Sequence, residues 1–118
     1  MAVALSELGS LVAPGSLLTS AAELAVYSYD GALDRARPDA VLVARSVAEV
    51  QRAVAWCAKH QAVFIARGAG TNLSGGCIPL KGGLVIALAR LNRILSLDAA
   101  ARVACVEPGV VNLDLQKE

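Results

Sequence analysis

Two short apolar runs, joined by a segment with helical character, constrain the fold of this chain more than any other feature. The runs are residues 40–44 (AVLVA) and 62–66 (AVFIA), and both are apolar throughout, as strands buried inside parallel sheets are. Between them, Ser46 with Glu49 three residues later is a capping-box pattern that opens a helix. Strand, helix and strand within about 27 residues predict a βαβ crossover, which is almost always right-handed.

The helix that follows Ser46 is expected to bury one apolar face, since apolar residues recur at helical spacing. That face comprises Val47, Val50, Val54 and Cys57 or Ala58, while Gln51, Arg52 and Lys59 lie off it. His60 follows at the helix end, where positive charge suits the helix dipole, so we expect a structural or solvent role for this histidine.

The flanking regions carry weaker signals. Residues 1–27 look helical with a break near Pro14, and Ser20 with Glu23 is a second capping-box pattern. Downstream, residues 83–88 (GLVIAL) predict a third strand. Residues 94–97 and 103–106 predict two shorter strands joined as a hairpin, and a final helix begins near Val110 with Asn112 as its N-cap.

A glycine-rich stretch, residues 67–76 (RGAGTNLSGG), follows directly after the second apolar run. Glycine backbone can approach a ligand closely and adopt positive φ, and successive exposed N–H groups can form an anion-binding nest. The short polar side chains of Thr71, Asn72 and Ser74 add hydrogen-bonding groups. Because the loop leaves the carboxyl end of a predicted strand, it favours a phosphate cradle for a nucleotide. A glycine-rich turn without a ligand stays open on loop chemistry alone.

The two best-known phosphate loops do not match this stretch. The dinucleotide fingerprint would need glycine at position 73, where the chain has leucine, and a helix directly after the loop. The P-loop would need lysine and then serine or threonine after its last glycine, whereas Cys77 follows Gly76. The loop therefore belongs to neither type.

Charge and composition exclude several classes of function. Eleven basic and ten acidic residues give a net charge of +1, and aromatics make up only 3%, so nothing predicts nucleic-acid binding. No apolar stretch reaches the ~20 residues of a transmembrane helix, and the N-terminus lacks the basic start of a signal peptide. We therefore expect a cytoplasmic protein. The three cysteines are widely spaced and predict reduced thiols, at least two of them in the core, rather than a metal site.

Residues 38–76 (PDAVLVARSVAEVQRAVAWCAKHQAVFIARGAGTNLSGG) resemble the start of the FAD-binding domain of the vanillyl-alcohol oxidase and p-cresol methylhydroxylase (PCMH) family. Within it they are most similar to the FAD-linked subunit of glycolate oxidase and to D-lactate and D-2-hydroxy acid dehydrogenases. YSYDG, GLVIALARLNRILSLD and VACVEPGVVNLDL fit the same pattern. The resemblance implies an α+β fold: the N-terminal subdomain of a PCMH-type FAD-binding domain, with a βαβ unit and a mixed sheet, truncated at its C-terminus. Residues 1–36 would be an N-terminal helical segment and residues 37–118 the incomplete domain.

The resemblance also assigns cofactor-binding residues. Backbone amides of the glycine loop would wrap the FAD diphosphate, two further loop residues would reach toward the ribityl or flavin, and a later segment would lie along the cofactor. These three sets are Gly68, Ala69, Gly70, Thr71 and Asn72; Ser74 and Gly75; and Pro108 and Gly109. Arg67 is expected to hold the strand end rather than to contact phosphate. Some relatives attach FAD through a histidine that aligns with Thr71, so we expect non-covalent FAD here.

What the resemblance implies for function is a flavoprotein oxidoreductase that oxidises a 2-hydroxy acid, of the glycolate or D-lactate type, to the 2-oxo acid by hydride transfer to FAD. Companion flavin and iron–sulfur subunits, and a peripheral place at the inner membrane through them, are implied as well. The alternatives are a cell-wall precursor reductase, a sugar-lactone oxidase, or a stand-alone nucleotide-binding module. No catalytic or metal-binding residue is expected within these residues, since Asp30 and Glu107 read as turn or strand-end carboxylates.

Overall fold

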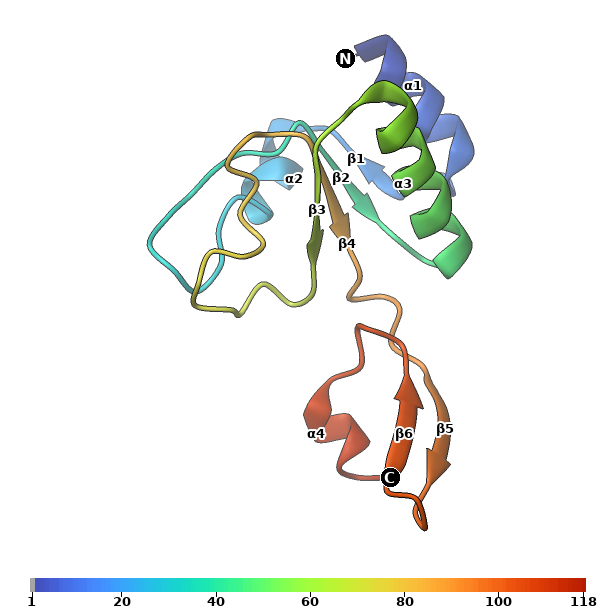
Figure 1. Ribbon diagram of the computed structural model, residues 1–118. Coiled ribbons are helices and arrows are strands. Elements are labelled where there is room, and N and C mark those ends of the chain that lie inside the picture. Colours follow the sequence, from blue (N-terminus) through green and yellow to red (C-terminus); the bar gives the residue numbers. More distant parts are fainter. Residues whose placement is uncertain (1) are drawn as a thin grey trace.

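A four-stranded mixed sheet organises the larger of two lobes in the computed structural model, which describes residues 2–118 (Figure 1). Its order is β1-β2-β4-β3, in which β2, β4 and β3 are parallel and β1 is antiparallel to β2. The strands are β1 (Leu17–Leu18), β2 (Ala40–Val43), β3 (Phe64–Arg67) and β4 (Leu84–Ala87). The helices of this lobe are α1 (Ala2–Leu11), α2 (Ala21–Val26) and α3 (Val47–His60). The predicted βαβ unit and mixed sheet are confirmed.

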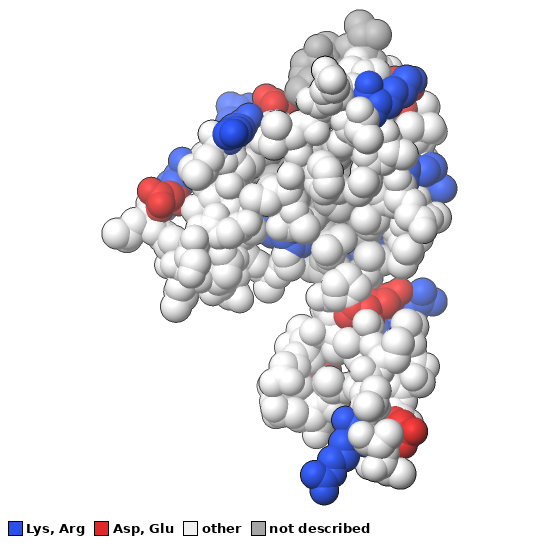
Figure 2. All heavy atoms as spheres, viewed as in Figure 1, with Lys and Arg blue, Asp and Glu red and all other residues white. Residues whose placement is uncertain are grey.

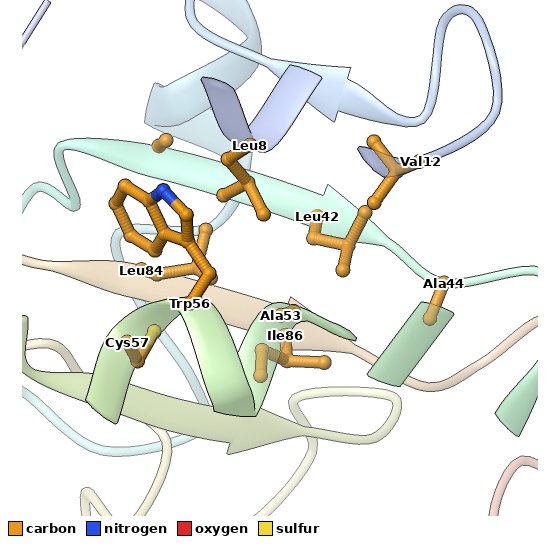
Figure 3. Packing of buried hydrophobic residues seen from close by; sticks show 10 residues of the cluster. Leu8, Val12, Leu42, Ala44, Ala53, Trp56, Cys57, Leu84 and Ile86 are labelled. Carbon is orange, nitrogen blue, oxygen red and sulfur yellow. The ribbon is translucent and has the colours of Figure 1, made fainter. Parts of the chain in front are cut away.

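The two faces of the sheet form two apolar clusters, because successive strand side chains point in opposite directions. On one face α1 and α3 pack over the sheet, with Trp56 and Leu8 against Leu42 and Leu84 (Figure 3). On the other face Leu24 of α2 packs with residues of β2 and β4, namely Val41, Val85 and Ala87. The sheet is therefore the middle layer of three, and β2 and β4 supply its buried centre.

The smaller lobe is an antiparallel hairpin followed by one helical turn. It contains β5 (Ile94–Asp98), β6 (Val103–Val106) and α4 (Asn112–Leu115). The predicted hairpin connection is present, since Asp98 Oδ1 accepts a hydrogen bond from the Ala101 N–H at 2.8 Å. The chain then returns toward the larger lobe, where the Gly109 N–H donates to the Leu91 carbonyl at 2.7 Å. This return brings Pro108 and Gly109 close to the residues that follow β3 and β4.

The second apolar run is an edge strand, which corrects the prediction that it is buried. β4 lies between β2 and β3, so β3 has a neighbour on one side only. Phe64 is 45% exposed and Val63, just before the strand, is 50% exposed. The prediction failed because an apolar run fixes strand character but not strand order, and the later β4 takes the central position.

The buried face of α3 also differs from the prediction. Val47 and Val54 are exposed, and Ala58 is exposed too, whereas Ala53 and Trp56 are buried beside Cys57. The helix turns its one large aromatic side chain inward, because Trp56 removes more apolar surface from water than a valine does. Val50 packs at the margin of the cluster.

One predicted capping box is complete and the other is not. Ser20 and Glu23 make both reciprocal contacts at the start of α2. At α3 the Ser46 side chain accepts from the Glu49 N–H, but the Glu49 carboxylate accepts instead from the N–H groups of Ala13 (2.7 Å) and Arg45 (2.6 Å). Asn112 is not the N-cap of α4, because Val111 holds that position without a side-chain bond.

Replacing Glu49 by glutamine should destabilise the protein by about 2 kcal/mol near neutral pH. The buried carboxylate accepts from two backbone N–H groups, and an amide has only one oxygen, so one of these N–H groups would lose its acceptor. Burial opposes ionisation, but the Ala13 and Arg45 amides outweigh it and lower the pKa of Glu49 below 4.5. Its stabilisation is therefore complete above about pH 4.5 and is lost as pH falls through the lowered pKa. Urea unfolding across this range should show the wild-type and Glu49→Gln curves converging at acid pH; a constant difference would contradict the assignment.

The cysteines are free thiols, as predicted, with Cys57 and Cys77 buried and Cys105 exposed. Among residues 2–118, no helix has both the length and the apolar character needed to cross a membrane. The proposed division at residues 36 and 37 stays a prediction. Residues on both sides of it share one sheet, because β1 pairs with β2.

Candidate functional site

The glycine loop leaves the carboxyl end of β3 and presents a row of free backbone amides. Within residues 2–118, none of the N–H groups of residues 68–77 donates a hydrogen bond to the protein. Gly70 and Gly75 adopt positive φ, +73° and +71°, which L side chains rarely do. Most of these residues are exposed, so their N–H groups are free to donate to an anion that lies against the loop.

A hollow of about 340 Å³ lies where the loop faces the smaller lobe. The start of the loop forms one wall, and the segment after β6 forms the other. Its lining residues are Gly68, Ala69, Ala89, Asn92, Ile94, Pro108, Gly109, Val110, Val111 and Asp114. Four predicted cofactor residues, separated by about 40 positions in the sequence, thus meet at one site. No sequence pattern pointed to Asn92 or Asp114 as part of it.

The other predicted cofactor residues lie further along the loop and do not line this hollow. They are Gly70, Thr71, Asn72, Ser74 and Gly75. Thr71, Asn72 and Ser74 are exposed. The Asn72 side chain is already engaged, because its Nδ2 donates to Asp30 Oδ2 at 2.6 Å. Asn72 can therefore meet a ligand through its backbone N–H rather than through its amide side chain.

Arg67 supports the loop from within, as expected. Only 7% of it is exposed, and its guanidinium donates to the Tyr29 carbonyl at 2.6 Å and lies over the Tyr27 ring, 5.6 Å from the centroid. A Cβ atom on Gly70 would overlap this guanidinium. Glycine at position 70 therefore lets the loop fold tightly over the buried arginine.

Titratable groups outside the loop, both near the hollow and elsewhere, are paired or buried in the protein. Glu107 accepts from the Arg93 side chain and N–H, and these bonds hold the pKa of Glu107 below its usual value. Burial raises the pKa of the Cys57 thiol, so Cys57 stays protonated in the core. His60 lies at the far end of α3, where its Nε2 is 2.7 Å from Glu7 Oε2. In the part of the chain that the structure describes, no cluster of three potential metal ligands occurs.

Charged side chains are mixed in sign on the face of the molecule that Figure 2 shows. On the face in Figure 2, basic and acidic side chains are scattered over both lobes, with no broad region of one sign. The backbone amides of the loop are therefore groups that can attract an anion without a charged surface patch.

Comparison with known proteins shows the family to which most of the chain belongs. A family model described as "FAD binding domain" matches residues 38–118. A Bacillus subtilis protein named "Glycolate oxidase subunit GlcD" is 42% identical over 91 residues, which are 76% of this chain and 19% of that protein. "D-2-hydroxyglutarate dehydrogenase" of Stutzerimonas stutzeri is 33% identical over 114 residues, 96% of this chain and 25% of the relative.

Solved structures share the fold. p-Cresol methylhydroxylase with bound substrate superimposes with a TM-score of 0.87 at 24% identity, over 98% of this chain and 24% of that one. 4-Ethylphenol oxidase from Gulosibacter chungangensis gives a TM-score of 0.81 at 29% identity, over 92% and 22%. The chain thus spans about a fifth to a quarter of the length of the proteins it matches.

Proposed function

The chain belongs to the FAD binding domain family, and on that premise we propose that the backbone of residues 68–72 holds the diphosphate of FAD. The observation that carries this proposal is the row of free amides of residues 68–77 at the carboxyl end of β3. FAD is the cofactor of this family, and its diphosphate oxygens accept hydrogen bonds from such amides. Pro108 and Gly109, across the hollow, would line the adjacent part of the cofactor.

The residues present fit this cofactor on steric grounds as well. A Cβ atom built on Gly68 meets nothing within 4 Å, so the protein leaves open space beside the loop. The hollow lined by Gly68, Ala69, Pro108 and Gly109 continues that space toward the smaller lobe. An extended dinucleotide can therefore lie along the loop, with its diphosphate at the amides.

We further propose that this loop binds FAD without a covalent link. By the family resemblance, Thr71 aligns with a histidine that links FAD covalently in some relatives. The one histidine of the chain, His60, pairs with Glu7 at the opposite end of α3. Binding then depends on the shape of the loop, which makes loop geometry the determinant of cofactor retention.

For the whole protein we propose oxidation of a 2-hydroxy acid to the 2-oxo acid. Support comes from relatives named for glycolate, D-lactate and D-2-hydroxyglutarate. When bound, FAD supplies the acceptor for the hydride from C2, while the hydroxyl proton leaves separately. The residues described here bind and orient; they offer no acid–base pair of their own, since Glu107 and Asp30 hold backbone and side-chain donors. The word "subunit" in the name of the Bacillus subtilis relative supports the existence of companion subunits. We propose that these carry flavin and iron–sulfur groups and hold the protein at the inner membrane.

Purified full-length protein should release intact FAD on denaturation and should be reduced by 2-hydroxy acids. Mass spectrometry of the native and then the denatured protein tests the first point. Anaerobic titration with glycolate, D-lactate and D-2-hydroxyglutarate, followed through the flavin absorbance, tests the second. Reduction by NADPH alone would indicate a cell-wall precursor reductase, and reduction by a sugar lactone would indicate a lactone oxidase. Protein without flavin would leave only a stand-alone module.

A further inference from the structure

Beneath the glycine loop, four polar side chains from separate segments meet in one cluster, here called the loop clamp. Its members are Asp30, Arg67, Asn72 and Cys77, and three of them are nearly buried: Asp30 is 8%, Arg67 7% and Cys77 5% exposed. Buried polar groups are costly unless they are hydrogen-bonded, so a cluster of this kind is maintained by its own internal bonds. The proposed function uses the outer side of the loop and leaves this inner side unexplained.

Asp30 is the acceptor at the centre of the loop clamp. Its Oδ1 accepts from the Ala32 N–H at 2.7 Å, which fixes the carboxylate relative to its own turn. Its Oδ2 accepts from Asn72 Nδ2 at 2.6 Å. The Gly31 N–H then donates to the Asn72 carbonyl at 2.9 Å. Residue 72 is thus held through both its side chain and its backbone by the turn at residues 30–32.

Cys77 closes the cluster on the other side. Its thiol lies 3.1 Å from Asn72 Oδ1 and 4.0 Å from Asp30 Oδ2, and Arg67 Nη1 lies 3.5 Å from the same sulfur. Both polar atoms of the Asn72 side chain are therefore occupied. The clamp holds the middle of the loop from below, while the amides of residues 68–71 stay free above it.

We propose that Asp30 is a positioning residue for FAD: it fixes residue 72, and so keeps the neighbouring amides aimed at the diphosphate. This inference rests on the proposed function and adds a residue that touches no cofactor atom. The clamp contains one anion, Asp30, and one cation, Arg67, so its two charges offset one another. Loss of the Asp30 charge alone would leave Arg67 uncompensated near an anionic ligand.

The charge of Asp30 allows a positioning role to be distinguished from a direct electrostatic effect of this residue on FAD. If Asp30 acted on FAD only through its charge, Asp30→Asn would remove a nearby repulsion and FAD would bind more tightly. If Asp30 positions the loop, the same variant binds FAD more weakly. An amide at position 30 can accept from Ala32 but turns a donor toward Asn72, so the Asn72 side chain must rotate and give up the Cys77 thiol. We expect about a tenfold weaker affinity, the size of one lost charge-assisted hydrogen bond.

Exchanging the residues at positions 30 and 72 should restore the hydrogen bond between them and, with it, part of the FAD affinity. Asn72→Asp alone places two carboxylates face to face and should weaken FAD binding more than Asp30→Asn does. The double variant Asp30→Asn/Asn72→Asp restores a donor opposite an acceptor, and its new carboxylate can still accept from the Cys77 thiol. We expect the double variant to bind FAD at least roughly tenfold more tightly than Asn72→Asp, since contacting pairs are coupled.

The experiment measures FAD affinity of the full-length apoprotein by flavin fluorescence, together with its melting temperature and the visible circular dichroism of bound flavin. Asp39→Asn is the matched control, because the Asp39 carboxylate accepts from the Gly83 N–H at 2.6 Å at the opposite end of the sheet. Weaker binding by Asp30→Asn with an altered flavin signal, rescue in the double variant and an unchanged control support the proposal. Equal or tighter binding by Asp30→Asn, or a fall in melting temperature without rescue, overturns it. Wild-type protein that binds no FAD overturns the proposed function itself.

Discussion

Replacing Gly70 by valine is expected to leave the full-length protein without flavin. The residue has φ +73°, where a β-branched side chain is strained by about 1–2 kcal/mol or more. The new Cβ would also overlap the Arg67 guanidinium, with Nε only 2.8 Å away. Arg67 would have to leave the Tyr29 carbonyl, and the free amides would lose their alignment. Together these effects should weaken FAD binding by roughly a hundredfold or more.

Gly76→Ala is the control within the same loop. Gly76 does not have positive φ, and a Cβ there meets only Asn72 Nδ2 at 3.9 Å, an ordinary contact. This variant should retain FAD at the wild-type level after purification, as judged by the ratio of flavin to protein absorbance. Full flavin content in Gly70→Val would show that the loop does not carry the diphosphate. A melting temperature measured on the apoprotein of both variants separates loss of binding from loss of folding.

Replacing Gly83 by alanine should destabilise the protein by about 3 kcal/mol or more. Gly83 has φ +82°, and a Cβ atom there would overlap the Val63 carbonyl oxygen. The same glycine anchors the start of β4: its N–H donates to Asp39 and its carbonyl accepts from the Asp39 N–H at 2.9 Å. Neither backbone segment can move without breaking the pairing of β4 with β3.

Gly9→Ala tests whether the loss at position 83 is local. Gly9 lies inside α1, where a Cβ would contact only Leu17 at 3.7 Å, so alanine should stabilise the helix by about 0.5–1 kcal/mol. Chemical unfolding of both variants, at matched pH, gives the two free energies. A Gly83→Ala protein as stable as the wild type would contradict the close approach of β4 to Val63.

The parts of the fold that could be predicted are those that depend on neighbours in sequence. The apolar runs at 40–44 and 62–66, the helix between them and the hairpin were all predicted within a few residues. Strand order was not, because the two runs look alike while β2 is central and β3 is an edge. Only the insertion of β4 between them decides this, and that is a tertiary event.

The site divides in the same way. Glycine content predicted the flexible loop, and the family resemblance predicted that residues 108–109 join it, which the shared hollow is consistent with. Tyr29-Asp30-Gly31 looked like ordinary turn chemistry. Its link to Asn72 spans 42 residues, and no local pattern encodes a bond between side chains that far apart. The Glu49 carboxylate was misassigned for the same reason, since its second partner, Ala13, lies 36 residues away.

The insertion of β4 between β2 and β3 also sets an order of events during synthesis. β2, α3 and β3 leave the ribosome first, yet β3 has no partner in the sheet until residues 84–87 follow. The glycine loop lies between β3 and β4 in the chain. The strand from which it starts, β3, is therefore held in the sheet only after β4 has been synthesised. Until then β3 is unpaired on both edges, rather than on one, and is available to other chains. Slow translation or delay before residue 84 should therefore favour aggregation, and the cofactor loop can take its final shape only once β4 has paired with β3.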